Sequence, residues 1–159
     1  MLRATQVLKA GSWQTAPSDR ITLRYDERHR RRLRFLADAG TEFLLDLPRT
    51  TVLCDGDGLK LEDDRIILVS AAAEPLLEVT AVNAEQLARL AWHIGNRHLP
   101  AQIATGRILL REDAVIETML AGLGATLRHI AEPFTPEPGA YDTSHTLPFA
   151  PGHAPHGHG

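Results

Sequence analysis

Residues 71–75, Ala71-Ala72-Ala73-Glu74-Pro75, separate two parts of the sequence whose patterns predict different folds. Before this stretch, turn residues recur at short intervals between runs rich in Val, Ile, Leu, Thr and Phe, which is typical of short β-strands. After it, strand-like and helix-like stretches alternate. We therefore predict an α+β protein with an N-terminal all-β, sandwich-like domain over residues 1–74, a second domain over residues 75–144 and a flexible His-containing tail over residues 145–159.

The N-terminal domain is predicted to consist of short strands joined by tight turns. Two Asp-Gly pairs in residues 55–58 are a strong signal for a hairpin, and residues 38–40 form another predicted turn. The expected strands cover residues 5–8, 21–25, 30–36, 41–45, 50–53, 59–61 and 66–70.

The second domain is predicted to follow the order β-α-β-β-α-β. Its strands are expected over residues 76–82, 101–105, 107–110 and 125–130. The first helix should begin at the N-cap Asn83, with Gln86 in capping-box spacing, and the second should begin near Asp113 and stop at Gly124. This order is the ferredoxin-like arrangement, in which two helices cover one face of an antiparallel sheet.

The first helix leads into Gly95-Asn96-Arg97-His98-Leu99-Pro100, a stretch that predicts a stiff, exposed turn. Gly95 is expected to end the helix in the left-handed conformation, and Pro100 cannot donate to a continuing helix. A constrained loop then presents His98 as a metal ligand, although lone histidines more often have surface or packing roles. One imidazole cannot fill a coordination shell, but a two-fold dimer with the turn on its axis supplies two.

The end of the chain is rich in Gly, Pro and His. It cannot bury enough apolar surface to offset the entropy of ordering, so we expect it to be mobile. A His-rich tract predicts metal binding because neutral imidazole binds nickel, zinc and copper. A purification tag is the alternative, but an artificial tag is usually an unbroken His run. The candidate tail ligands are His153, His156 and His158, with His145 as a further candidate; His93 is assigned a structural or supporting role.

Arginines cluster between Arg24 and Arg34. Their alternation predicts a half-buried strand with a basic outer face and with Leu33 and Phe35 on the other face. Two interpretations stay open: a solvated edge that discourages aggregation, or a docking surface for an acidic protein. RNA binding ranks third, because the predicted strands of the second domain contain no Phe or Tyr for stacking. The cluster consists of Arg24, Arg28, Arg30, Arg31, Arg32 and Arg34.

The whole chain sets limits on function. Seventeen basic and twenty acidic residues give a net charge of −3, which provides no general attraction to nucleic acid or to a membrane surface. A single cysteine, no signal-peptide pattern and no run of about 20 apolar residues predict a cytoplasmic protein. We find no nucleophile–base constellation, no phosphate-binding glycine loop and no compact zinc spacing, which argues against an enzyme.

Four separate motifs agree in order with one family. They are residues 95–100, residues 28–35 (Arg-His-Arg-Arg-Arg-Leu-Arg-Phe), residues 40–48 (Gly-Thr-Glu-Phe-Leu-Leu-Asp-Leu-Pro) and residues 136–141 (Pro-Glu-Pro-Gly-Ala-Tyr). Together they resemble the urease accessory nickel metallochaperones called UreE, over nearly the whole chain.

This resemblance implies an N-terminal domain able to bind peptides and a ferredoxin-like metal-binding domain through which a homodimer forms. It also implies that His98 is the interfacial ligand of Ni(II), and that the partners are the urease apoprotein and the GTPase that assists its nickel loading. Such ligands also accept Zn(II) or Cu(II) in vitro. Some members carry extra histidines where this sequence has Arg111-Glu112-Asp113-Ala114, so a capacity of about one ion per dimer is expected. The competing function is a non-enzymatic interaction module that uses the Arg24–Arg34 face, with incidental metal binding.

Overall fold

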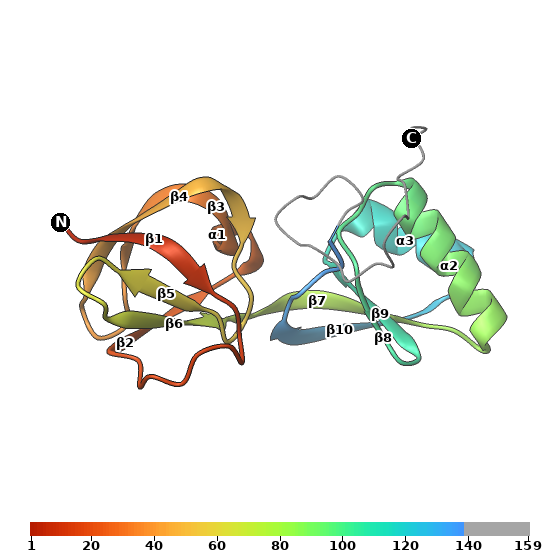
Figure 1. Ribbon diagram of the computed structural model, residues 1–159. Helices are drawn as coiled ribbons and strands as arrows, with labels where there is room; N and C mark the ends of the chain where they lie inside the picture. Colours follow the sequence, from red (N-terminus) through yellow and green to blue (C-terminus); the bar gives the residue numbers. More distant parts are fainter. Residues whose placement is uncertain (139–159) are drawn as a thin grey trace, which may run out of the picture.

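The computed structural model describes residues 1–138, which form two β-sheets joined by the chain at strand β7 (Figure 1). The first sheet has six strands in the order β2-β6-β5-β1-β4-β3, and the second has four in the order β10-β7-β9-β8. The prediction of an α+β fold that begins with an all-β part is confirmed. No helix within residues 1–138 is long and apolar enough to cross a membrane.

The first part is a single curled sheet closed around one core. Its elements are β1 (Arg3–Leu8), β2 (Asp19–Leu23), α1 (Tyr25–Arg28), β3 (His29–Leu36), β4 (Glu42–Val52), β5 (Gly58–Leu61) and β6 (Ile66–Ala71). Alternate side chains such as Phe43, Leu45, Ile67 and Val69 are fully buried in that core. This period of two is what places one face of each strand inward.

Strand β4 differs from the prediction, because the expected strands 41–45 and 50–53 are one continuous element. The register opposite β3 shifts between Arg30, which pairs with Thr51, and Arg32, which pairs with Asp46. Pro48 lies between Asp46 and Thr51, in the part of β4 that has no paired residue on β3. A proline has no backbone N–H for the ladder, and a bulge lets the strand continue past it. The single helical turn α1 was also not predicted.

A buried carboxylate, Asp19, holds the turn between β3 and β4 against the start of β2. It accepts hydrogen bonds from the backbone N–H groups of Arg20 (2.7 Å), Ala39 (2.9 Å) and Thr41 (3.2 Å). Burial alone would raise the pKa of Asp19, but these bonds and one from the Thr41 side chain outweigh it and lower the pKa to about 2. The ionised carboxylate therefore stabilises the fold.

Asp19→Asn is expected to lower the free energy of unfolding at pH 7 by about 2 kcal/mol, the value of a pKa lowered from 3.8 to about 2. The stabilisation by Asp19 is complete above pH 4 and is lost as the pH falls from about 4 to 2. Urea unfolding of the wild type and the variant should therefore differ at pH 7 and converge near pH 2. An equal difference at both pH values would contradict this role.

The second part confirms the predicted order β-α-β-β-α-β. Its elements are β7 (Ala73–Thr80), α2 (Ala84–Asn96), β8 (Gln102–Ala104), β9 (Arg107–Arg111), α3 (Ala114–Gly122) and β10 (Thr126–Pro133). All neighbouring strands of its sheet are antiparallel. Both predicted caps are present: Asn83 accepts a bond from the Gln86 N–H (2.8 Å), and Asp113 accepts from Val115 and Ile116.

The two helices cover one face of this sheet. Leu90 and Ile94 of α2 pack with Ile116 and Leu120 of α3 against the strand residues Leu77, Val79, Ile108 and Leu110. Residues of β7 alternate, so Leu77 and Val79 face the helices whereas Leu76 and Glu78 face the opposite side. The helix-free face of the sheet is thus left for other contacts.

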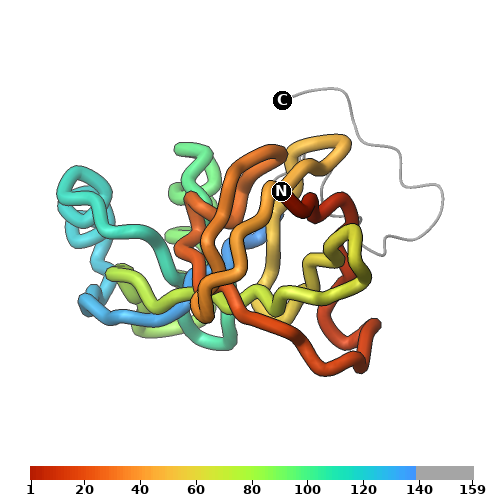
Figure 2. The backbone as a smooth tube through the Cα atoms, turned by 90° about the vertical axis from the view of Figure 1, so that its left-hand side faces the viewer, coloured from red at the N-terminus to blue at the C-terminus, as the bar shows by residue number. Residues whose placement is uncertain are grey.

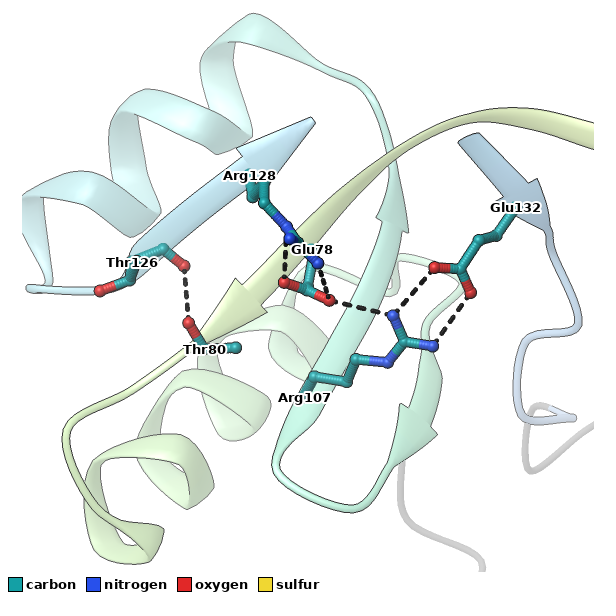
Figure 3. Close-up of polar contacts among 6 residues, drawn as sticks. All are labelled: Glu78, Thr80, Arg107, Thr126, Arg128 and Glu132. Carbon is teal, nitrogen blue, oxygen red and sulfur yellow. Dashed lines mark hydrogen bonds and ion pairs between the residues drawn. The ribbon is translucent and has the colours of Figure 1, made fainter. Parts of the chain in front are cut away.

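Ion pairs occupy part of that helix-free face (Figure 3). Arg107 lies between two carboxylates, with Nη1 3.0 Å from Glu78 and Nη2 3.0 Å from Glu132, and Arg128 approaches Glu78 at 3.1 Å. The hydrogen bond from Arg107 holds the pKa of Glu78 below its usual value. These pairs link β7, β9 and β10 across the sheet and make its surface a fixed charged layer.

Arg28 connects the two parts of the molecule. It was predicted to belong to the basic surface cluster, and that prediction is wrong because its side chain is fully buried. The turn α1 directs the guanidinium inward, where it donates to the carbonyl oxygens of Leu23 (3.3 Å), Leu53 (3.1 Å) and Phe134. Leu23 and Leu53 belong to the first part and Phe134 follows β10, so this one side chain ties both parts together.

Tyr25 and Arg111 complete the junction. The Tyr25 ring meets the buried Phe134 ring edge to face at 5.4 Å, and the Arg111 guanidinium lies over Tyr25 at 5.3 Å from the ring centroid. Arg111 also pairs with Asp26 at 2.7 Å, and Glu74 accepts the Tyr25 N–H at 2.9 Å. Contacts of this kind hold the two sheets in one orientation.

Candidate metal centre

The turn that carries His98 is built on the end of α2. Leu90 and Ile94 anchor the helix in the core, and the backbone N–H groups of Arg97 and His98 bond to the carbonyls of Ile94 (3.2 Å) and Gly95 (3.0 Å). The bonds tighten the last turn and give the helix end a defined geometry. The residue after that end is therefore held in place by its backbone.

His98 itself adopts the left-handed backbone conformation, with φ of 57°. In residues 1–138 the one other non-glycine residue with positive φ is Asp64. The prediction that Gly95 takes this role is wrong: Gly95 lies inside α2, which reaches Asn96, and His98 follows the C-cap residue Arg97. That position after a C-cap is where a left-handed residue usually ends a helix, and histidine tolerates it better than most residues.

The His98 side chain is exposed between two anchored neighbours. Ile94 is buried on the helix side, and Leu99 packs against the same core on the other side. His98 is thus an accessible imidazole on a backbone that cannot easily shift. The imidazole is therefore open to a ligand from solvent.

The end of the described chain lies beside this turn. After Phe134, the Thr135 N–H donates to the Gln102 side chain (2.9 Å), and the Glu137 N–H donates to the Ala101 carbonyl (2.8 Å). Ala101 and Gln102 follow directly on Pro100 of the predicted turn. The segment that leads into residues 139–159 is therefore hydrogen-bonded to residues that follow His98 by three and four positions.

The other described histidines have protein partners. His93 meets the exposed Trp92 ring at 5.0 Å and His29 meets the Tyr25 ring at 6.3 Å, each in an edge-to-face arrangement. Neither lies on the loop that carries His98. The predicted tail ligands His153, His156 and His158, and also His145, lie outside the described residues.

His129 on β10 forms a cluster that sequence reasoning missed. Its two ring nitrogens bond to Glu112 and, at 2.6 Å, to Glu117 of α3. The hydrogen bonds to both carboxylates raise the pKa of His129. Since each ring nitrogen is used by a carboxylate, the cluster acts as a clamp between α3 and β10. No spacing in the sequence predicts this cluster, because His129 reaches Glu112 and Glu117 only after β10 has paired with β7.

Within residues 1–138, no group of three or more His, Cys, Asp or Glu side chains is arranged to hold a metal ion. Among the histidines of residues 1–138, His98 is the one that lies exposed in a loop with a left-handed backbone. No carboxylate in that range is paired with its ring. Its donor, a borderline imidazole nitrogen, suits Ni(II), Zn(II) and Cu(II).

Two family models match the chain. The model described as the UreE urease accessory protein N-terminal domain matches residues 2–72, and that of the C-terminal domain matches residues 74–159. The chain is 54% identical to a urease accessory protein UreE of Bradyrhizobium sp. (strain ORS 278), over 89% of this chain and 67% of the relative. It is 50% identical to a UreE of Rhodobacter capsulatus, over 92% of this chain and 91% of the relative.

Proposed function

The chain belongs to the UreE family of urease accessory proteins, and from this premise we propose that it captures Ni(II) in the cytoplasm and delivers it for assembly of the urease active site. A UreE protein is an accessory, chaperone-type protein and not urease itself. The proposed partners are a second copy of the chain, the urease apoprotein and the GTPase that assists nickel loading.

The observation that carries this proposal is the backbone of His98. A non-glycine residue in the left-handed region costs free energy, and such residues persist where the surrounding structure holds them, often at functional sites. The exposed ring cannot coordinate a metal ion tightly alone, because one donor leaves most of the shell to water. In a two-fold dimer with this turn on the axis, two His98 rings share one ion.

The tail is proposed to supply the remaining donors, His153, His156 and His158. The anchored segment 135–137 supports this, because it starts the tail next to Ala101 and Gln102. His153 lies fifteen positions after Pro138. An extended chain of that length reaches about 50 Å, so distance alone does not prevent tail histidines from meeting the His98 pair.

The proposed chemistry is capture and transfer, with no covalent bond made or broken in a substrate. Imidazole must be neutral to coordinate, so each ligand histidine exchanges a proton for the metal ion. The same donors take Zn(II) and Cu(II), and Cu(II) generally binds more tightly, so nickel selectivity depends on geometry and supply. Equilibrium dialysis of the full chain against Ni(II) tests whether the protein binds the ion at all; no binding at pH 7.5 would overturn the proposal.

Nickel affinity is expected to fall as the pH drops below about 6.5, the reference pKa of histidine. Each coordinating imidazole contributes about a tenfold loss per pH unit in that range, because the proton competes with Ni(II) for the same nitrogen. Calorimetric titrations at pH 7.5 and 5.5 measure the effect. A constant affinity across this range would instead indicate carboxylate ligands.

Removing the residues after Pro151 is expected to weaken nickel binding while the dimer persists. The deletion takes away three imidazoles that are proposed to complete the shell, and it leaves both sheets untouched. The matched control is the full-length chain with His153→Ala, His156→Ala and His158→Ala, which should lose the same affinity. Dialysis gives the affinity and light scattering the mass; a monomeric truncated protein would contradict this division of roles.

A further inference from the structure

Strand β3 forms a free edge of the first sheet. It is last in the strand order, and among the described strands it pairs with β4 alone. Figure 2 draws these two strands in neighbouring shades of orange. We call residues 30–34 of this strand, Arg30-Arg31-Arg32-Leu33-Arg34, the arginine edge. All five residues are exposed, so this part of the strand is solvent-accessible on both faces, whereas a half-buried strand was predicted. Burial begins at Phe35.

The four arginines of the arginine edge have no ion pair with any residue from 1 to 138. Elsewhere in that part of the chain, Arg3, Arg65, Arg107 and Arg111 each pair with a carboxylate. Asp46 lies opposite Arg32 in the ladder, but the ion pair of this carboxylate is with Arg3, at 3.1 Å. Four positive charges within five residues repel one another, and a source of negative charge would relieve that repulsion.

The spacing of these charges matches an extended peptide. Alternate strand residues point to the same face, so Arg30, Arg32 and Arg34 stand about 7 Å apart along one side of β3. A second strand with acidic residues at alternate positions has the same repeat. Guanidinium groups also bind carboxylates through two parallel hydrogen bonds, which favours this pairing over a diffuse attraction.

We propose that the arginine edge binds an extended acidic segment of a partner protein, which adds to the first sheet as a strand beside β3. The unpaired backbone groups of the edge supply hydrogen bonds, and the arginines select for acidic side chains. The exposed Leu33, on the opposite face from these three arginines, offers a contact for intervening side chains of the segment. The same arginines repel another copy of this edge, which protects the sheet from self-association.

A nucleic acid fits this edge less well. Binding of single strands relies on exposed aromatic rings on which bases stack, and the one aromatic residue of the Phe or Tyr type on β3, Phe35, is buried. The net charge of −3 also provides no long-range attraction for a polyanion. The proposal is independent of the proposed metal site, because His98 follows helix α2 in the second part of the molecule.

The test uses the full-length protein and a short fluorescent peptide of alternating glutamate and valine, followed by fluorescence anisotropy. The variant Arg30→Gln/Arg32→Gln/Arg34→Gln is expected to bind the peptide about tenfold more weakly or worse, since it loses three exposed ion pairs. The control Arg65→Gln/Arg89→Gln/Arg97→Gln removes the same charge elsewhere and should bind within about twofold of the wild type. Equal losses in both variants would overturn the proposal.

Two further probes separate strand addition from other binding. A peptide with alternate backbone amides methylated should lose affinity, because it cannot pair along the edge; undiminished binding would overturn strand addition. Oligothymidylate of equal charge should bind more weakly than the peptide, and tighter binding that depends on the three arginines would overturn the protein partner. Nickel dialysis of the Arg30→Gln/Arg32→Gln/Arg34→Gln variant should match the wild type, so failure here leaves the metal proposal intact.

Discussion

His98→Ala is expected to remove most of the tight nickel binding, with an affinity loss of more than about a hundredfold. Loss of a residue that merely supports a metal ligand costs about 10- to 100-fold, and loss of a ligand itself should cost more. In the proposed dimer one substitution deletes two donors at once, since each copy contributes His98.

The backbone of this turn requires a second variant. Alanine in the left-handed conformation is strained, so His98→Ala could alter the turn as well as the ligand. His98→Asn avoids this, because asparagine adopts the same conformation readily while it removes the imidazole. Both variants should lose nickel binding alike if the ring is the cause.

His93→Ala is the matched control, since it removes a histidine from the same helix end that meets Trp92 instead of pointing from the turn. Calorimetry at pH 7.5 gives affinity and stoichiometry, and light scattering gives the oligomeric state. The assignment of His98 fails if His98→Asn binds nickel with unchanged affinity and stoichiometry, or if His93→Ala has the larger effect.

Arg28→Ala is expected to destabilise the folded protein by about 3 kcal/mol or more. The side chain is fully buried and donates to three backbone carbonyls, and a buried acceptor left without a donor costs about 1–3 kcal/mol. Burial lowers the pKa of Arg28 below its usual value, which the nearby Glu74 carboxylate opposes, but a guanidinium stays protonated in proteins. The charge is thus buried and must keep its partners.

Urea unfolding of Arg28→Ala against Arg31→Ala measures this effect, because Arg31 is an exposed arginine three residues later. Arg28→Lys should fall between wild type and Arg28→Ala, as an ammonium group cannot span three carbonyls in fixed directions. The radius of gyration in solution scattering should rise for Arg28→Ala, since the bond to Phe134 joins the two sheets. Equal unfolding midpoints for Arg28→Ala and Arg31→Ala would contradict the role of Arg28 as a junction.

Much of the fold followed from local patterns. Alternation predicted most strands to within a few residues, and Asn83 and Asp113 cap their helices as expected. The predicted elements were wrong where one local sequence signal is compatible with two backbone structures. Gly95 is a natural helix end, yet the left-handed position went to His98; Pro48 normally interrupts a strand, yet a bulge carried β4 past it.

The sequence by itself determined that two differently patterned parts exist, that a constrained turn presents His98, and that a tail with histidines follows. Only the tertiary structure decided that Arg28 is buried, that Glu112 and Glu117 hold His129, and that residues 135–137 lie along residues 101–102. Capping and alternation act over a few neighbouring residues, so they leave a signature in the sequence. Arg28 and Phe134 are 106 positions apart and Thr135 and Gln102 are 33 apart, and such contacts form only when the sheets assemble.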